Sequence, residues 1–235
     1  MDEEFELAED AHPHRVFGRR KGKQLRLHQK ELMETLLPRV DALTFVGSYR
    51  ASDTGAHKQL WLEIGFGGGE HLAAQAAAHP DIGFIGCEPF VNGVAKLLVQ
   101  VEARGLDNVY IHADDATRLL ARLPDASVDR VYILFPDPWP KRRQRKRRFF
   151  NEDTLCEFAR VMKPGAELRF ATDIDDYAGW ALARVLASGE IVWEPGETGA
   201  WNAPWPDHHT TKYESKAVKE GRKSVYLTFR RVATV

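Results

Sequence analysis

The residues best suited to chemistry form an acidic, proline-rich motif in the middle of the chain. It reads Phe135-Pro-Asp137-Pro-Trp139-Pro-Lys141 and follows an apolar run. Prolines on both sides of the aspartate and the tryptophan restrict the backbone, so the loop is stiff. A stiff loop suits a site that must present a carboxylate and an aromatic face in fixed geometry, although a rigid turn leaving a strand has the same composition. Its predicted position opposite a glycine-rich turn favours the functional interpretation and makes Asp137 the candidate catalytic residue.

The glycine-rich turn reads Glu63-Ile-Gly65-Phe-Gly67-Gly-Gly69-Glu70 and follows a predicted strand. Glycine lets the backbone turn sharply and approach a ligand closely. A dinucleotide-binding turn has a further glycine, next to a bound pyrophosphate, where this chain has Glu70. A carboxylate there disfavours a phosphate and favours an adenosine ligand without one, such as S-adenosylmethionine. The alternative is a tight turn that binds no ligand.

Carboxylates follow the next two predicted strands as well. Glu88 ends the second strand and Asp115 follows the third. A carboxylate at the end of the second strand of such a sheet commonly holds ribose hydroxyls, so we expect Glu88 to bind the ribose. We expect Asp115 to meet the adenine amino group. Carboxylates at successive strand ends, together with Glu63, favour a cofactor site over a plain turn.

A basic run comes directly after the proline-rich motif. Residues 141–148 hold seven Lys or Arg in eight positions, and residues 15–30 hold seven more. The formal net charge is only -1, but a local patch attracts a polyanion because the field acts within a Debye length of about 8–10 Å. Such a run is usually a solvated face. Its position beside the candidate site, and the suitability of Arg and Lys for phosphate, favour a nucleic-acid substrate.

Two later segments also carry polar groups. Asp173 closes a fifth strand and is expected to face the same site, and Thr211-Lys212-Tyr213-Glu214 follows a Trp-, Pro- and His-rich stretch. The sequence leaves open whether residues 211–214 form a surface loop or a lid. His208 and His209 have no spaced carboxylates or cysteines beside them, so no metal site is expected.

Strands and helices alternate from residue 59 onward. This alternation predicts a doubly wound, mostly parallel α/β sheet with helices on both faces. Strands are expected at 59–64, 82–87, 109–112, 128–135, 167–171 and 224–230, and helices at 23–37, 70–78, 88–103, 115–121, 151–162 and 175–187. Residues 41–58 are expected to form a loop, and residues 1–14 a disordered arm. Because ligands bind beyond the carboxyl ends of such strands, the loops after residues 64, 87, 112, 135 and 171 should line one site.

Composition limits the classes of protein that remain. The 235 residues are 43% hydrophobic and 29% charged, as in a globular protein with one α/β domain. We expect an N-terminal arm and basic helix at 1–58 and the main domain at 59–235. Cys87 and Cys156 lie far apart, and Cys87 is expected to be buried. No run approaches the ~20 apolar residues of a membrane span, and the acidic start is unlike a signal peptide, which predicts a cytoplasmic protein.

Taken together, these motifs resemble the tRNA (guanine-N7)-methyltransferase family. The resemblance spans most of the chain. Its most specific part is the Phe-Pro-Asp-Pro-Trp motif combined with the basic run and the Thr-Lys-Tyr-Glu segment. The motifs that carry it are Arg15-Val-Phe-Gly18-Arg19, Leu62-Glu63-Ile-Gly65-Phe-Gly67-Gly-Gly69, Gly86-Cys-Glu88-Pro, Phe135-Pro-Asp137-Pro-Trp139, Ala171-Thr172-Asp173 and Thr211-Lys212-Tyr213-Glu214.

The resemblance implies a seven-stranded Rossmann-like methyltransferase sheet with an antiparallel last strand. It also implies methylation of guanine 46 in the tRNA variable loop, with S-adenosylmethionine as cofactor. The implied cofactor contacts are Glu63, Gly65, Gly67, Glu88, Asp115 and Asp137. The implied substrate contacts are Lys141, Asp173, Thr211, Lys212, Tyr213 and Glu214. The implied RNA contacts are Arg143, Gln144, Arg145, Lys146, Arg147 and Arg148. Pro140 stands where the family often has a polar residue and Tyr213 where it often has Phe, but neither change removes a needed group.

Two other functions remain open at this point. An NAD-dependent dehydrogenase would share the fold, but Glu70 and the basic run count against it. A methyltransferase-fold subunit that binds RNA without catalysis would share the basic surface, but the glycine turn and the Asp137 motif are intact. The sequence indicates no obligate partner besides tRNA and is compatible with a monomer or a homodimer.

Overall fold

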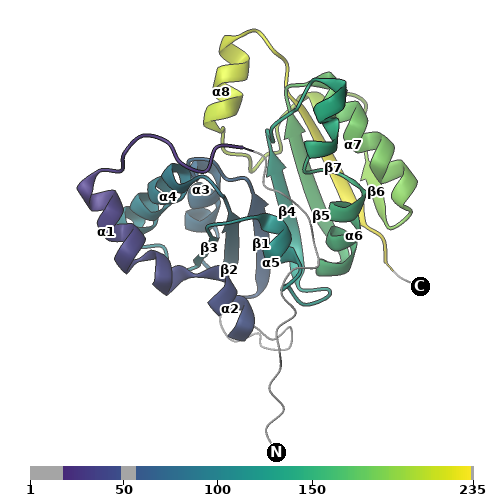
Figure 1. Ribbon diagram of the computed structural model, residues 1–235. Helices are drawn as coiled ribbons and strands as arrows, with labels where there is room; N and C mark the ends of the chain where they lie inside the picture. The colour runs from purple at the N-terminus through teal and green to yellow at the C-terminus, as the bar shows by residue number, and fades with distance from the viewer. Residues whose placement is uncertain (1–17, 49–56, 234–235) are drawn as a thin grey trace, which may run out of the picture.

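A seven-stranded β-sheet with the strand order β3-β2-β1-β4-β5-β7-β6 forms the centre of the molecule (Figure 1). The structure is a computed structural model and describes residues 18–48 and 57–233. Strands β3, β2, β1, β4 and β5 pair in parallel, and β7 runs antiparallel to both β5 and β6. The strands are β1 (Gln59–Ile64), β2 (Ile82–Cys87), β3 (Val109–His112), β4 (Val128–Leu134), β5 (Met162–Thr172), β6 (Ile191–Glu194) and β7 (Val225–Arg231). This arrangement confirms the expected doubly wound sheet with an antiparallel last strand.

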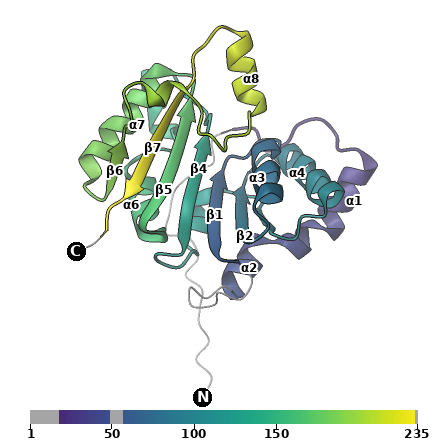
Figure 2. The ribbon, with the colours of Figure 1, turned by 180° about the vertical axis from the view of Figure 1, so that it is seen from behind.

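Helices cover both faces of the sheet. Helices α1, α3 and α4 contribute to the core on one face, and α2, α5, α6 and α7 to the core on the other. Figure 1 shows α5 and α6 in front of the sheet, and Figure 2 shows α3 and α4 from behind. The helices are α1 (Leu27–Thr35), α2 (Ala42–Ser48), α3 (Glu70–Ala78), α4 (Val91–Arg104), α5 (Ala116–Leu120), α6 (Glu152–Val161), α7 (Asp175–Ser188) and α8 (Lys212–Lys219). Short 3-10 helices span Leu37–Val40 (η1), Arg142–Arg147 (η2) and Ala200–Asn202 (η3).

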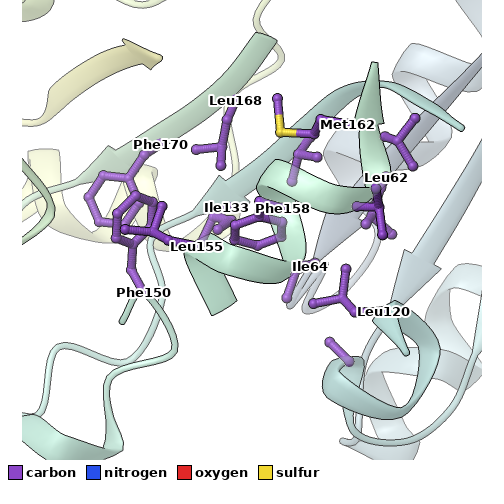
Figure 3. Packing of buried hydrophobic residues seen from close by; sticks show 14 of the residues in the cluster. Leu62, Ile64, Leu120, Ile133, Phe150, Leu155, Phe158, Met162, Leu168 and Phe170 are labelled. Atoms are coloured by element: carbon purple, nitrogen blue, oxygen red, sulfur yellow. The ribbon is translucent and has the colours of Figure 1, made fainter. Parts of the chain in front are cut away.

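The two-residue period of the strands divides the core between the faces. Leu62 and Ile64 of β1 belong to the core beneath α5 and α6, whereas Trp61 belongs to the core beneath α3 and α4. Figure 3 shows Leu62 and Ile64 near Ile133 of β4 and Phe158 of α6. Phe158 is fully buried, and truncating such a side chain to alanine costs about 3–5 kcal/mol. Cys87 is also buried, as expected.

Local signals set several of the helix ends. Helix α4 ends at Gly105, which adopts a left-handed conformation with φ of 61°. Helix α6 begins after Asn151, whose side chain accepts a hydrogen bond from the Thr154 backbone N–H. Both ends agree with the sequence prediction to within two residues.

The structure differs from the expected elements in several places. Residues 42–48 form α2 and not a loop, because the Asp41 side chain accepts from the Thr44 N–H at 2.7 Å and starts the helix. Two strands also differ, since β5 begins at residue 162 and not at 167, and the edge strand β6 was not expected. The first helix is shorter than expected, 27–35 in place of 23–37. Residues 212–219 form helix α8. The predicted arm at 1–14, and the start of the basic segment at 15–17, lie outside the described residues.

Helix α8 does not belong to either covering layer. Both views place it beyond one end of the sheet, apart from the helices that pack on the faces (Figures 1 and 2). Among the described residues, no helix is long and apolar enough to cross a membrane.

Candidate active site

A cavity of about 820 Å³ lies at the carboxyl ends of the central strands. Its wall includes the last residues of β1 and β2 together with Asp115, which follows β3, and Asp137, which follows β4. Four of the five loops that were expected to share a site therefore do so. The loop after β5 does not reach the wall, and neither does its Asp173. A cavity of this size is in the usual range for a small-molecule site.

Two glycines where the glycine turn meets α4, Gly67 and Gly93, cannot be replaced by larger residues without strain. Gly67 has a left-handed backbone with φ of 57°, and its N–H donates to Glu88 Oε2 at 2.8 Å. A side-chain carbon on Gly93, in the first turn of α4, would lie 2.2 Å from the Gly67 carbonyl oxygen. Both positions therefore require glycine. The result is a fixed backbone cradle between β1 and α4.

Glu88 holds this cradle together from the end of β2. Its carboxylate accepts from the N–H groups of Gly67 at 2.8 Å and Phe90 at 2.9 Å. The side chain is buried against the cavity, and this burial raises the pKa of Glu88, while the two hydrogen bonds act in the opposite direction. A carboxylate has about four acceptor positions, so Glu88 can still accept from ligand hydroxyls. This geometry agrees with its predicted role at a ribose.

Glu63 occupies a different place from the one expected. Side chains alternate across β1, so Glu63 points to the face that α3 covers, as Trp61 does. Its Oε2 lies 2.7 Å from His71 Nδ1, and both side chains are buried. Glu63 does not line the cavity. We therefore assign it a supporting role behind the glycine turn in place of direct cofactor contact.

Asp115 lines the cavity at the start of α5. One carboxylate oxygen accepts from the Thr117 N–H at 3.0 Å, which caps the helix. The cap fixes the side chain at the wall and leaves acceptor positions for a ligand amino group. Its placement is compatible with the predicted adenine contact.

The proline-rich motif turns Asp137 into the cavity. Phe135 and Trp139, which flank it, have left-handed backbones with φ of 51° and 41°, a conformation that costs non-glycine residues about 1–3 kcal/mol each and gathers at functional sites. Asp137 is open to the cavity, and desolvation by the surrounding protein raises its pKa. A side-chain carbon built on Gly18 would lie 3.8 Å from Asp137 Oδ2, so the N-terminal segment reaches this carboxylate.

Arg148 holds the Asp137 loop from beneath. It is fully buried, its Nε donates to the Pro138 carbonyl at 2.8 Å, and its Nη2 donates to Asp176 Oδ2 at 2.5 Å. Its guanidinium lies over the Tyr177 and Trp180 rings, at 4.7 and 4.9 Å. The Arg148 hydrogen bond also lowers the pKa of Asp176. Arg148 was expected to contact RNA; because its side chain is fully buried, we infer that it positions the loop instead.

The rest of the basic run is divided between ion pairs and open surface. Arg145 pairs with Asp176 at 2.7 Å, so α7 supplies an acidic partner that the run itself lacks. Lys146 and Arg147 line the cavity, and the Arg147 guanidinium lies 5.0 Å from the centre of the Trp139 ring. The residues of this run outside the cavity wall are Lys141, Arg142, Arg143, Gln144 and Arg145.

The N-terminal segment closes one side of the cavity. Arg19 lines it, and the Arg20 carbonyl accepts from the Val91 N–H at 3.0 Å. Asn92 accepts from the Gly22 N–H at 2.7 Å and donates to the Lys23 carbonyl at 2.6 Å. This part of the basic segment is thereby tied to the start of α4.

The Thr-Lys-Tyr-Glu segment starts α8. Thr211 and Glu214 form a capping box, in which each side chain accepts from the backbone N–H of the other, at 3.1 and 3.2 Å. Glu214 is buried, lies 2.7 Å from His208 Nε2 and accepts from the Tyr226 hydroxyl. Burial acts to raise the pKa of Glu214, but the hydrogen bonds from His208 and Tyr226 outweigh it and hold the pKa below its ordinary value. Glu214 therefore anchors α8. It was expected to contact the substrate, but it does not line the cavity.

The other two residues of the segment do reach the cavity. Lys212 and Tyr213 line it, and the Tyr213 ring lies over the glycine turn, 3.1 Å from where a side chain on Gly67 would begin. Asp173 and Thr211 do not line it. Asp173 instead pairs with Arg222, beyond the end of α8, at 2.5 Å. The two ends of α8 are thus tied to the sheet by Glu214 and Asp173.

Several lining residues were not singled out from the sequence, among them Lys96, Lys216 and Lys219. The signal for the two on α8 was present, because Thr211-x-x-Glu214 is a capping-box pattern that predicts a helix start. A helix from residue 212 places Lys216 and Lys219 on the face of Lys212. Among the described residues, no cluster of His, Cys, Asp and Glu side chains is arranged to bind a metal ion.

Known proteins with similar sequences are methyltransferases. Residues 57–227 match a family described as a putative methyltransferase. A tRNA (guanine-N(7)-)-methyltransferase from Nitrobacter hamburgensis is 50% identical over 220 residues, covering 92% of this chain and 86% of its own length. A protein of the same description from Bradyrhizobium diazoefficiens is 48% identical over 219 residues, covering 92% of each chain.

Solved structures agree in fold. The 16S rRNA methyltransferase KamB superposes with a TM-score of 0.53 at 16% identity, over 77% of this chain and 91% of its own. A 16S rRNA (adenine(1408)-N(1))-methyltransferase from Catenulisporales acidiphilia, described with its cosubstrate SAM, gives 0.52 at 18% identity, over 78% and 90%. The sheet order, the glycine turn and the carboxylates at the strand ends define a Rossmann-like methyltransferase. Within that class, the chain belongs to the tRNA (guanine-N(7)-)-methyltransferase family.

Proposed function

We propose that this protein transfers a methyl group from S-adenosylmethionine to N7 of a guanine in tRNA, and that the guanine is number 46 of the variable loop. The observation that carries the proposal is that one cavity is lined by Glu88, by Asp137 and by the cation Lys146. A ribose-binding carboxylate, a catalytic carboxylate and a phosphate-binding cation would then share one cavity. Family membership supports guanine N7 as the acceptor.

The residues of the cavity fit the cofactor. Gly67 and Gly93 both line the cavity, and without side chains their backbone would let a ligand approach closely. Glu88 would hold ribose hydroxyls, Asp115 the adenine amino group, and Glu70, which also lines the wall, would accept from an amino group. Carboxylates at Glu70, Glu88 and Asp115 suit a cationic ligand without phosphates. When bound, S-adenosylmethionine supplies a methyl group already activated by its sulfonium.

Asp137 would act on the guanine and not on a proton. Guanine N7 carries a free lone pair at neutral pH, so the reaction requires alignment more than it requires a base. Positive charge develops on the purine as the methyl group arrives, and a fixed carboxylate nearby stabilises that charge. Asp137 stands in a strained, proline-stiffened loop that Arg148 fixes through the Pro138 carbonyl. The protein therefore supplies a negative group whose position is set before the substrate arrives.

The cations at the mouth of the cavity would select a nucleic acid. Lys146 and Arg147 line the mouth beside Asp137, and Arg142 and Arg143 are exposed in the same 3-10 helix. Phosphate contacts from such residues fix the register of a nucleic acid without reading its sequence. They would present one guanine to the cavity, and the fold of the tRNA would decide which one.

The test uses the purified protein, S-adenosylmethionine with a labelled methyl group, and tRNA transcripts. A transcript with guanine at position 46 should acquire label and become sensitive to chain cleavage at 7-methylguanine. A matched transcript with adenine at position 46 should acquire no label. Label at another guanine would contradict the assignment of position 46, and label on a different atom would contradict the proposed reaction.

A further inference from the structure

Helix α8 presents a row of lysines at the mouth of the cavity. Lys212, Lys216 and Lys219 are spaced by four and three residues, which places them on one face of the helix. All three are exposed and all three line the cavity. We propose that this face of α8 is a second binding surface for the phosphate backbone of tRNA, on the α8 side of the cavity that η2 also borders. The inference rests on the proposed function and adds to it: tRNA phosphates would be bound on two sides of the cavity, by the basic run and by α8.

The charges on this face are largely uncompensated. Among the described residues, no salt bridge joins Lys212 or Lys219 to a carboxylate, and Lys216 meets Glu220 only at 3.9 Å, with both side chains exposed. Arg222, just beyond the end of the helix, is by contrast paired with Asp173 at 2.5 Å. An exposed pair such as Lys216 with Glu220 contributes about 0–1 kcal/mol. The row is therefore available to a polyanion.

The charges of the cavity wall are divided between structural elements. Carboxylates stand at the strand ends, on Glu88, Asp115 and Asp137, whereas lysines stand on α8. A phosphate chain would be attracted to the lysines and repelled by the carboxylates. A neutral base would meet no such repulsion, and a base acquiring positive charge would be favoured at the carboxylates. This order of charges suits a substrate whose backbone stays at the mouth while one base enters.

The lysine row is held on a rigid support. The opposite face of α8 buries Glu214 and Ala217, and Glu214 is held by His208, by Tyr226 and by the capping box with Thr211. A helix anchored in this way loses little conformational freedom when a ligand binds. Ser215 lies among the lysines, also lines the cavity and has a hydroxyl that can donate to a phosphate.

The test compares two charge-matched variants of the full-length protein. K216Q/K219Q removes two charges from α8. K58Q/R122Q removes two charges from exposed residues outside the cavity wall, Lys58 just before β1 and Arg122 just after α5. Binding of an unmodified tRNA transcript is measured at several salt concentrations, cofactor binding is measured by calorimetry, and each variant is unfolded thermally.

We expect K216Q/K219Q to weaken tRNA binding roughly ten-fold or more at low salt. The slope of log affinity against log salt should fall by about 1.4–1.8, which corresponds to two lost phosphate contacts. The control should keep the wild-type slope, and both variants should bind S-adenosylmethionine within two-fold of wild type. An unchanged slope in K216Q/K219Q, or an equal loss in the control, would overturn the proposal. If wild type methylates guanine N7 in tRNA while K216Q/K219Q keeps its slope, only the α8 proposal fails. If wild type neither binds nor methylates tRNA, the proposed function itself fails.

Discussion

Replacing Arg148 separates positioning from RNA binding within the basic run. The R148K variant keeps the positive charge but loses the planar guanidinium that reaches both Pro138 and Asp176 and lies over two aromatic rings. A hydrogen bond that involves a charged group contributes about 1.5–3 kcal/mol. Asp176 is partly exposed to solvent, which reduces the contribution of the Arg148–Asp176 ion pair to stability. We therefore expect R148K to lower the free energy of unfolding by about 2–3 kcal/mol.

For a chain of this size, that loss lowers Tm by roughly 4–12 °C. The catalytic effect should be larger than the stability effect suggests, because a shift of the loop misplaces Asp137. A misplacement of about 1 Å can cost on the order of a hundred-fold in rate, so we expect kcat to fall ten- to a hundred-fold at a temperature where the variant is folded.

The assay combines single-turnover methylation of tRNA, thermal unfolding and the salt dependence of tRNA binding. R143K is the matched control, since Arg143 is exposed in the same run and outside the cavity wall. R148K should keep the wild-type salt slope while losing rate and stability, and R143K should keep both rate and stability. A wild-type rate and an unchanged Tm in R148K would refute the positioning role.

Three further predictions follow from the site. E88A should weaken S-adenosylmethionine about ten- to a hundred-fold with the fold intact, since the lost acceptor contributes about 1.5–3 kcal/mol; unchanged affinity in calorimetry would reject the ribose placement. R143Q/K146Q should flatten the salt slope of tRNA binding by about 0.7–0.9 for each lost phosphate contact and leave cofactor affinity unchanged; a wild-type slope would make these residues a solvated face. The pKa of Glu214 is lower in the folded chain than its ordinary value. Ionised Glu214 therefore stabilises the fold at pH values above the ordinary glutamate pKa near ~4.3, and this stabilisation is lost as the pH falls through the pKa of Glu214 in the folded chain. E214Q should therefore show a weaker acid dependence of Tm than wild type, and an identical dependence would contradict the anchoring of α8.

The central sheet was predictable because its signals are local and repeated. Strands β1, β2 and β3 begin and end where their apolar runs do, and Gly105 marks the end of α4. The loops after four of the strands converge as the topology requires. The C-terminal part was harder, because among the described strands β6 pairs only with β7, which follows it after a long intervening segment.

The direction of individual side chains was not predictable from strand ends alone. Glu63 and Ile64 are neighbours, but the alternation across β1 sends Glu63 to His71 and Ile64 to the cavity. Arg148 reads as one more cation in a basic run, and only the packing of α7 against the run shows that Asp176 and Trp180 enclose it. These placements depend on contacts between residues far apart in the sequence, which a local pattern does not contain.

The most direct test of the account is the single-turnover rate constant of D137A with saturating S-adenosylmethionine and tRNA. We expect D137A to lose most of this rate constant while it still binds cofactor and tRNA, because the carboxylate acts on charge that develops during transfer. It also predicts a wild-type rate that is flat from about pH 6 to 8, since no proton must leave N7. Because desolvation raises the pKa of Asp137, the acid fall in rate should begin at a higher pH than for an ordinary aspartate near ~3.9. A near-wild-type rate constant in D137A would contradict the central claim, and a wild-type rate that rises ten-fold per pH unit across this range would indicate a general base instead.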